Sequence, residues 1–254
     1  LDSAGITLAS VYIDAPFNYN NGRPVSNWYH SGYKGICSVR YGIEQSLNII
    51  AVKTLTQITP QLGYEYLENF GFTTIVDRRV TASGQVLSDI NQPLALGGIT
   101  DGVTNLELNA SYATIANGGI YMEPILYTKI VDQNGNVIID NTQEQESRRV
   151  IKETTAFLLT SAMVDVVTKG TGGSVNFGGM AIAGKTGTTS GYNDVWFAGY
   201  TPYYTATTWT GYDNNVSLSS KSGNDEQAIS KVLWRNIMKR IHENLPNKQF
   251  SVPA

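Results

Sequence analysis

Three extended runs near the end of the sequence restrict the fold most strongly. They are rich in β-branched, aromatic and small residues, and they cover 180–189, 194–201 and 203–213. Connections this short join antiparallel neighbours, because a parallel pair requires a crossover of a dozen residues or more. The sequence therefore predicts an antiparallel sheet, and its first strand contains the tripeptide Lys185-Thr186-Gly187.

Helices are predicted before these strands. Helical spacing or capping signals cover 38–59, 60–71, 104–119 and 152–168, and the expected N-terminal caps are Ser38, Thr59 and Thr104. Glu107 follows Thr104 at capping-box spacing, and Gly71, Gly118 and Gly119 are expected to end their helices. Asn134-Gly135 predicts a hairpin whose two turn residues both have positive φ.

A further helix is predicted after the strands. Ile229, Leu233, Ile237 and Ile241 recur every four residues with Val232 beside them, which indicates an amphipathic helix up to about Leu245. Helices followed by an antiparallel sheet with a terminal helix laid on it form an α+β plan. The length of 254 residues suits one domain, 1–245, followed by a loose tail at 246–254.

Composition excludes several function classes. The net charge is -3 and no Lys/Arg run could neutralise phosphates, so nucleic acid is not an expected partner. The single Cys37 excludes an intramolecular disulfide, and His30 with His242 are too few for a histidine-based metal site. We expect no metal and no cofactor. No run approaches the ~18 apolar residues of a membrane span, and there is neither an initiator Met nor a signal pattern.

Lys185 would need a serine partner if its K-T-G has a chemical role, because serine enzymes with K-T-G also use a Ser-x-Asn motif. The pattern occurs three times, at Ser46, Ser174 and Ser222. Ser222 follows K-T-G and resembles a helix start, while Ser174 lies in a glycine-rich connection. Ser46 fits a short connection between two helices, which can aim its hydroxyl into a cleft, but spacing alone also permits an ordinary helix residue.

Several blocks together resemble one family. "QSLNIIAVK", "PLALGG", "TNLELNASYATIANGGIYMEP", "AGKTGTTSGYNDVWFAGYTP" and "WTGYD" occur in the order seen in penicillin-binding proteins. They look most like the transpeptidase domain of the class A, bifunctional type, over about 13–245. The resemblance implies an antiparallel sheet with helices packed on it and a helical subdomain, as in penicillin-recognising serine transpeptidases and β-lactamases.

The resemblance also implies roles for individual residues. Lys185 would hold a substrate carboxylate and bias the Ser46 hydroxyl as a proton relay, and Asn48 would bind the amide of the acyl donor. Gly187 would keep the strand edge bare for a peptide. Thr186 and Thr188 would offer hydroxyls to the carboxylate, and the Thr188 N–H would form half of an oxyanion hole. Thr189 completes the expected substrate-binding set.

The implied reaction is the cross-linking of peptidoglycan stem peptides on lipid-linked precursor strands, and β-lactam antibiotics would acylate the same serine. Such an enzyme works at the outer face of the bacterial cytoplasmic membrane, anchored by a segment outside this chain. The family's nucleophile is the serine of a helical S-x-x-K. Ser31-Gly-Tyr-Lys34 is the one S-x-x-K in the sequence, and Gly32 with Gly35 disfavours a helix there.

We therefore expect the nucleophile in an upstream segment of the same protein, just before Leu1. The alternatives are a non-catalytic sensor that binds β-lactams or peptidoglycan, or a D,D-carboxypeptidase or β-lactamase of the same superfamily. The class A-like blocks argue against a D,D-carboxypeptidase or a β-lactamase. Two further points stay open. Asp194 is either a turn residue or a carboxylate in a cleft. The aromatic side chains of the strands either pack on one another, which is the commoner case across antiparallel strands, or stack on a ligand; they are Trp196, Tyr200, Tyr204 and Trp209.

Overall fold

The computed structural model describes residues 1–142, 145–221 and 224–253. Its centre is a three-stranded antiparallel sheet in the order β11-β10-β9. The strands are β9 (Ala183–Thr188), β10 (Asp194–Tyr200) and β11 (Thr205–Gly211). Lys185 pairs with Ala198, and Trp196 pairs with Trp209. The predicted sheet is confirmed, and Lys185 lies on one of its edge strands.

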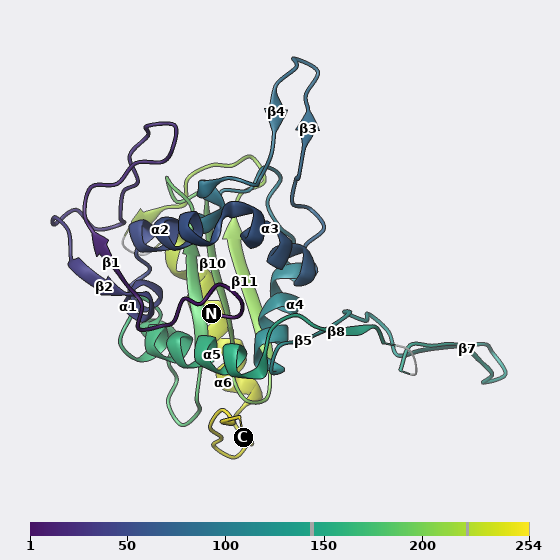
Figure 1. The fold of residues 1–254 in the computed structure, drawn as a ribbon. Helices are drawn as coiled ribbons and strands as arrows, with labels where there is room; N and C mark the ends of the chain where they lie inside the picture. Colours follow the sequence, from purple (N-terminus) through teal and green to yellow (C-terminus); the bar gives the residue numbers. More distant parts are fainter. Residues whose placement is uncertain (143–144, 222–223, 254) are drawn as a thin grey trace.

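Helices cover both faces of this sheet (Figure 1). They are α4 (Asn105–Ala116) and α5 (Glu153–Thr168) on one face, and α6 (Ile229–Ile241) on the other. The hydroxyl of Tyr200 is hydrogen-bonded to Thr160 of α5 at 2.7 Å. The ring of Phe197 packs edge-on against Trp234 of α6, with centroids 4.9 Å apart. Strand residues three apart point to opposite faces, so the sheet is a buried layer between helices, as the α+β prediction requires.

A second core lies in the helical part of the chain. Its elements are α2 (Asn48–Ile58), α3 (Pro60–Asn69) and the 3-10 helix η1 (Gln92–Leu96). Leu55, Tyr64 and Leu94 meet there with Phe72 and Ile75. This cluster is the helical subdomain that the sequence predicts, and α2 and η1 lie next to each other in it. The short helix α1 (Val39–Glu44) precedes these elements and packs through Val39 against Ala162 of α5.

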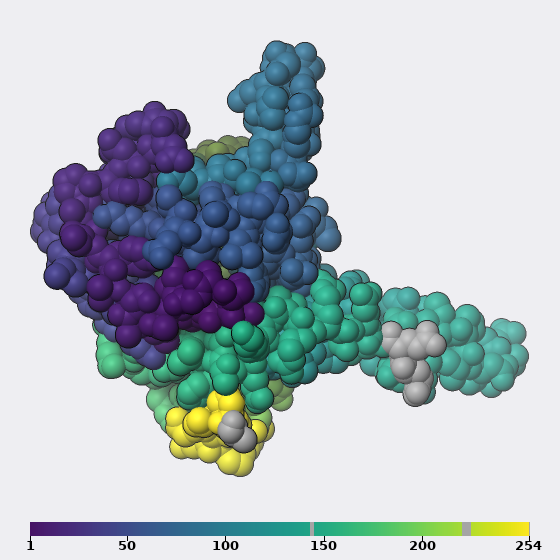
Figure 2. Space-filling view, in the orientation of Figure 1, coloured from purple at the N-terminus to yellow at the C-terminus, as the bar shows by residue number. Residues whose placement is uncertain are grey.

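Short hairpins and turns surround the two cores. The strand pairs are β1 (Val11–Asp14) with β2 (Gly35–Ser38), β3 (Arg79–Val80) with β4 (Val86–Leu87), β5 (Ile120–Met122) with β8 (Ser147–Arg149), β6 (Lys129–Val131) with β7 (Val137–Asp140), and β12 (Ser220–Lys221) with β13 (Asn224–Asp225). The remaining 3-10 helices are η2 (Gly173–Val175) and η3 (Glu226–Ala228). The β3–β4 and β6–β7 hairpins project from the body (Figure 2). Among the described residues, no helix combines the length and apolar content needed to cross a bilayer.

The predicted helix boundaries hold where a cap sets them. The Ser38 hydroxyl accepts a hydrogen bond in the first turn of α1, and Thr59 does the same for α3. Thr104 and Glu107 form both bonds of a capping box at α4. Gly71, with φ of 92°, follows the last turn of α3. These signals are local, so the sequence is sufficient to find them.

The apolar row that predicted α6 lies on its outer face. Ile229, Val232, Leu233, Ile237 and Ile241 are 44–52% exposed, whereas Ser230, Trp234 and Met238 are fully buried. Trp234 buries a larger side chain than any residue in that row, and its indole N–H donates to the Ala206 carbonyl at 2.9 Å. The prediction of a helix is confirmed, but the face it implied for packing is wrong.

The C-terminal tail is not loose. Phe250 packs edge-on against the buried ring of Tyr200, with centroids 5.5 Å apart. The Tyr203 hydroxyl donates to the Pro246 carbonyl at 2.9 Å, and the Lys248 ammonium lies over the Tyr203 ring. The expectation of a loose tail was wrong because the tail makes distant contacts with Tyr200 and Tyr203, which its polar composition does not indicate.

The hairpin at Asn134-Gly135 has a longer turn than predicted. Only Gly135 has positive φ, and the loop between β6 and β7 runs from 132 to 136. The Asp132 carboxylate accepts from the backbone N–H groups of Asn134 and Asn136 at 2.8 and 2.9 Å. This side-chain cap stabilises the wider loop, so the hairpin is confirmed and the turn type is not.

Cys37 lies in a small core behind the β1–β2 hairpin. It packs against Leu47 and Ile50 at the start of α2, with Tyr12 and Tyr29 at the border. Burial raises the pKa of its thiol, and the nearby Asp14 carboxylate acts in the same direction. A thiol held neutral in this way behaves as a small apolar side chain.

The carboxylate of Glu107 should stabilise the protein in a pH-dependent manner. It accepts from the N–H and hydroxyl of Thr73 at 2.8 and 2.6 Å, and from the N–H and hydroxyl of Thr104 at 3.1 and 2.9 Å. Burial opposes ionisation, but these bonds lower its pKa below the ordinary value. The stabilisation is therefore present above about pH 4.3 and lost as pH falls through the lowered pKa.

We expect Glu107→Gln to lower the free energy of unfolding by about 1 kcal/mol at pH 7, and by less at pH 3. Glu68→Gln, on the exposed face of α3, is the control. Denaturant unfolding at both pH values measures the effect. A difference that does not shrink in acid would contradict the prediction.

Candidate active site

Ser46 lies where the predicted helix at 38–59 breaks into α1 and α2. Its N–H donates to the Ile43 carbonyl at 3.2 Å, and the Leu47 N–H donates to the Gly42 carbonyl at 2.9 Å. These are the two bonds of a Schellman motif, whose left-handed position is usually glycine. Ser46 occupies that position with φ of 54°, a conformation that costs a residue with a side chain about 1–2 kcal/mol.

Lys185 reaches Ser46 from the edge of the sheet. Its ammonium donates to Ser46 Oγ at 2.7 Å and to the Thr186 carbonyl at 3.2 Å. Burial lowers the pKa of Lys185 from its ordinary value to about 8. Two interpretations of Ser46 were open, an ordinary helix residue and a connection between two helices. In the structure it lies in a connection between helices, and its hydroxyl faces Lys185.

This pair is suited to moving protons. A lysine ammonium only donates, so Ser46 Oγ accepts from it and keeps its own proton for another acceptor. A pKa of about 8 leaves Lys185 close to the point where either protonation state is accessible at neutral pH. The same ammonium is a compact positive charge that a carboxylate can approach.

The other predicted residues lie around this pair. Asn48, the first residue of α2, donates to the Ser26 carbonyl at 2.8 Å. The Thr186 hydroxyl is hydrogen-bonded to that of Thr171 at 3.1 Å, while Thr188 is exposed at the end of β9. Thr186 and Thr188 thus lie on the same edge strand as Lys185, and their role in binding a substrate stays a prediction.

Gly187 and Thr189 each contact neighbours on β10. A Cβ on Gly187 would lie 3.3 Å from Trp196 Cβ, so the strand is bare where it meets that side chain. The Thr189 hydroxyl accepts from the Asp194 N–H at 2.8 Å, and Asp194 Oδ1 accepts from the Trp209 indole at 2.9 Å. Asp194 is therefore the first residue of β10, where the chain leaves the β9–β10 turn, and its carboxylate is bonded to Trp209. The Thr189 hydroxyl is engaged at the same place.

The aromatic side chains of the strands pack mainly on one another and on helices. Trp196 and Trp209 are paired across β10 and β11 with centroids 6.2 Å apart, Tyr200 is fully buried, and Tyr204 packs edge-on against His242. Packing was the favoured interpretation of these residues.

The remaining serine motifs differ from Ser46. Ser174 is exposed within η2, and Ser222 lies outside the described residues. Ser31 is in an irregular segment with Gly32 and Gly35 at φ of 71° and 72°, so Ser31 and Lys34 do not lie on a helix turn. The predicted absence of a helix at this S-x-x-K is confirmed.

Sequence reasoning missed the segment 26–28. Its carbonyl at Ser26 accepts from Asn48, and the Trp28 indole donates to the Gln45 carbonyl at 2.9 Å, so it contacts both sides of Ser46. The only signal was the density of Asn, Tyr and Gly between 14 and 35. That composition predicts an irregular loop, and it does not indicate that the loop contacts the residues around Ser46.

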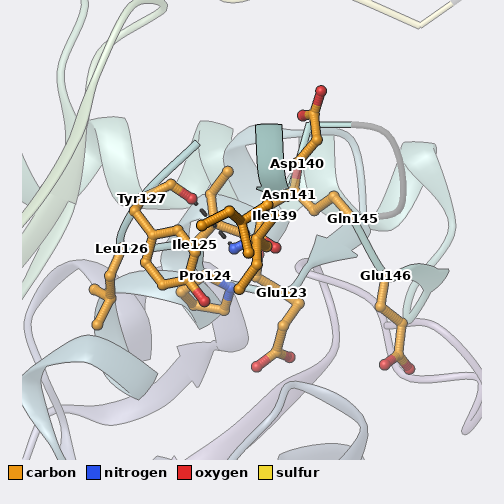
Figure 3. A pocket seen from close by; sticks show the side chains of 11 residues that line it. Glu123, Pro124, Ile125, Leu126, Tyr127, Ile139, Asp140, Asn141, Gln145 and Glu146 are labelled. Atoms are coloured by element: carbon orange, nitrogen blue, oxygen red, sulfur yellow. Dashed lines mark hydrogen bonds between the residues drawn. The ribbon is translucent and has the colours of Figure 1, made fainter. Parts of the chain in front are cut away.

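A hollow of about 790 Å³ lies away from these residues, at the base of the β6–β7 hairpin (Figure 3). Its lining mixes aliphatic side chains with the carboxylates of Glu123, Asp140 and Glu146, and none of the predicted site residues belongs to it. The chemistry suggested by Lys185 and Ser46 is therefore not located in this hollow.

Comparison with known proteins decides the family. The sequence profile of the penicillin-binding protein transpeptidase domain matches residues 1–239. The chain belongs to this family. Penicillin-binding protein 1A of Clostridium botulinum is 34% identical over 266 residues, covering 100% of this chain and 30% of the relative. Penicillin-binding protein 1A/1B of Bacillus subtilis is 28% identical over 91% of this chain and 25% of its own length.

Solved structures of the family share the fold. PonA1 of Mycobacterium tuberculosis in complex with penicillin V has a TM-score of 0.83 and 25% identity, over 98% of this chain and 68% of that one. Penicillin-binding protein 1A of Haemophilus influenzae has a TM-score of 0.80 and 24% identity, over 98% of this chain and 41% of that one. The chain is a transpeptidase domain of the penicillin-binding proteins, similar to class A members, and it spans about 30% of the first curated relatives.

The left-handed conformation of Ser46 predicts an unusual stability pattern. Ser46→Gly relieves the strain, whereas Ser46→Ala retains it, so the glycine variant should be more stable than the alanine variant by about 1 kcal/mol. At Ser174, in η2, glycine should instead be the less stable of the two. Denaturant unfolding of the four variants measures this, and the same order at both positions would refute the assignment of strain to Ser46.

The buried ammonium of Lys185 predicts a pH dependence of stability. Between pH about 8 and 10.5, the unfolded chain keeps this proton while the folded chain loses it. Stability linked to Lys185 therefore rises with pH in this window. The free energy of unfolding of the wild type minus that of Lys185→Met should increase from pH about 8 to 10.5. The same difference taken against Lys239→Met, a control at an exposed lysine, should not increase. A flat difference against Lys185→Met would mean that the ammonium is not desolvated.

Proposed function

We propose that this chain forms most of a D,D-transpeptidase domain, 1–245, that cross-links peptidoglycan stem peptides through a serine acyl-enzyme. The observation that carries the proposal is the hydrogen bond between the Lys185 ammonium and Ser46 Oγ at 2.7 Å, in a chain of the penicillin-binding transpeptidase family. Stem peptides on lipid-linked precursor strands are the proposed substrates. β-Lactams are proposed to acylate the same serine, and a relative was solved with penicillin V.

The nucleophile is proposed to come from an upstream S-x-x-K of the same protein. Its hydroxyl attacks the penultimate D-Ala carbonyl, and its proton passes through the Ser46 hydroxyl to the amine of the leaving D-Ala. An amine of a neighbouring stem then attacks the ester, releases the serine and forms the cross-link. Every proton that the serine loses returns in the second step, so no cofactor is required.

The residues of this chain have distinct proposed roles. Lys185 holds the substrate carboxylate with the hydroxyls of Thr186 and Thr188, and it orients Ser46 as the relay. Asn48 binds the amide of the acyl donor. The Thr188 N–H contributes half of the oxyanion hole, while Gly187 keeps the edge of β9 narrow enough for an extended peptide. Thr189 supports this edge through the turn to Asp194.

The strained backbone of Ser46 favours an enzyme over a non-catalytic sensor. A binding module gains nothing from a serine at a position where glycine is more stable, whereas a relay requires the hydroxyl. Resolution by water instead of an amine would make a D,D-carboxypeptidase, with the same residues in the first step. The proposed site of action is the outer face of the cytoplasmic membrane, where an anchor outside this chain would hold the domain.

Fluorescent penicillin tests this function. The chain 1–254 alone should not be labelled, and the protein with its upstream segment should be labelled on the serine of that segment. In that protein, Ser46→Ala should slow acylation by about 10²–10⁴, the usual contribution of a positioned proton-transfer group, and Ser174→Ala should have little effect.

Mass spectrometry of the labelled peptide identifies the acylated serine. A stable adduct on a serine of 1–254 would overturn the upstream assignment. Labelling without turnover of a stem pentapeptide would favour the sensor. Release of D-Ala without a cross-linked product, when an acceptor stem is supplied, would favour the carboxypeptidase.

A further inference from the structure

The segment 26–28 holds Ser46 from both sides. The Ser26 carbonyl accepts from Asn48 at 2.8 Å, and the Trp28 indole donates to the Gln45 carbonyl at 2.9 Å. Between them, Asn27 Oδ1 accepts from the Ile49 N–H at 3.2 Å. The residue before α2, Leu47, supplies no side-chain cap of its own. Asn27 therefore caps this helix from a distant part of the chain.

Asp14 fixes the segment from behind. It is 1% exposed at the end of β1. Its Oδ1 accepts from Asn27 Nδ2 at 2.8 Å, and its Oδ2 accepts from the Lys34 N–H at 2.7 Å and from the Tyr29 hydroxyl. Asn27 Nδ2 also donates to the Tyr29 oxygen at 2.8 Å. Asp14, Asn27 and Tyr29 thus form a closed ring of hydrogen bonds.

The ring determines which way the Asn27 amide faces. A carboxylate accepts only, so the amide must turn its NH₂ toward Asp14, and its oxygen is then left for the Ile49 N–H. Burial opposes ionisation of Asp14, but the bonds from Tyr29, Lys34 and Asn27 lower its pKa below the ordinary value. The charge that orients Asn27 is therefore maintained at neutral pH.

We propose that Asp14 is a positioning residue for acylation: through Asn27 it holds the first turn of α2, and with it Ser46 and Asn48, in place against Lys185. The inference rests on the proposed function. Asp14 need not touch the substrate, because it acts through Asn27, whose side-chain oxygen accepts from the Ile49 N–H three residues after Ser46. Displacement of a reacting group by about 1 Å can lower a rate 10²-fold, so a buried carboxylate behind the site can matter as much as a residue within it.

Asp14→Asn in the complete protein tests the proposal. An amide offers one acceptor oxygen to three donors, so the Asn27 side chain loses its fixed orientation. We expect the penicillin acylation rate to fall about 10- to 100-fold, and the Ile49 amide to exchange faster in hydrogen–deuterium exchange. Asn27→Ala should give a similar loss, and the double variant should lose no more than either single variant.

Asp89→Asn is the matched control. Asp89 is also 1% exposed, and it accepts from the Val76 N–H, the Thr100 N–H and the Thr100 hydroxyl at 2.7, 2.8 and 2.5 Å. It belongs to a loop that makes no hydrogen bond to the residues around Ser46 in the described part of the chain. We expect a comparable loss of melting temperature with less than about a 2-fold change in acylation.

The outcomes separate this inference from the proposed function. Equal slowing by Asp14→Asn and Asp89→Asn, additive losses in the double variant, or faster Ile49 exchange with normal acylation would each overturn the positioning role. An unlabelled wild-type protein would remove the proposed function, and the Ile49 exchange would still decide whether Asp14 holds the start of α2.

Discussion

The site depends on one hydrogen bond between two separately built parts of the molecule. Lys185 belongs to the sheet and Ser46 to the helical region, and their side chains meet only when these parts are packed at a fixed distance. Arg40 of α1 forms an ion pair with Asp165 of α5 at 2.7 Å, and Lys169 pairs with the same carboxylate at 2.9 Å. Burial opposes ionisation of Asp165, but these two cations lower its pKa. Beside them, a Cβ on Gly170 would lie 2.1 Å from the Glu44 carbonyl oxygen, so only glycine permits this approach.

Elements that depend on neighbours in sequence were predictable. The sheet strands follow from their short connections, and the starts of α1, α3 and α4 follow from Ser38, Thr59 and the Thr104–Glu107 pair, because a cap and its target lie three residues apart. Ser46 marks the limit of this approach. A Schellman motif is usually recognised by glycine, and a serine in its place leaves the helix pattern apparently continuous.

Features set by distant contacts were not predictable in the same way. The row of Ile229, Leu233, Ile237 and Ile241 has more aliphatic members than the row of Trp234 and Met238, yet it is the second row that packs on the sheet. There the Trp234 ring packs against Phe197 and its indole N–H donates to the Ala206 carbonyl. The tail follows the same rule through Phe250 and Tyr200. Asp14 gave no signal because its partners Asn27 and Lys34 are 13 and 20 residues away, and the Ile49 N–H that Asn27 caps is 22 residues from Asn27. Local composition cannot reveal which polar residues will be buried together.

The burial of Cys37 has a practical consequence for measuring motion in this protein. Its thiol packs against Leu47 and Ile50, directly beneath the first turn of α2, and it is the chain's one cysteine. A thiol reagent can modify it only when the β1–β2 hairpin separates from α2, so the modification rate reports how often that opening occurs. In the wild-type chain, the rate at which Cys37 is modified therefore measures how often the first turn of α2, which begins at Asn48 and follows Ser46, becomes exposed, and no introduced probe is needed.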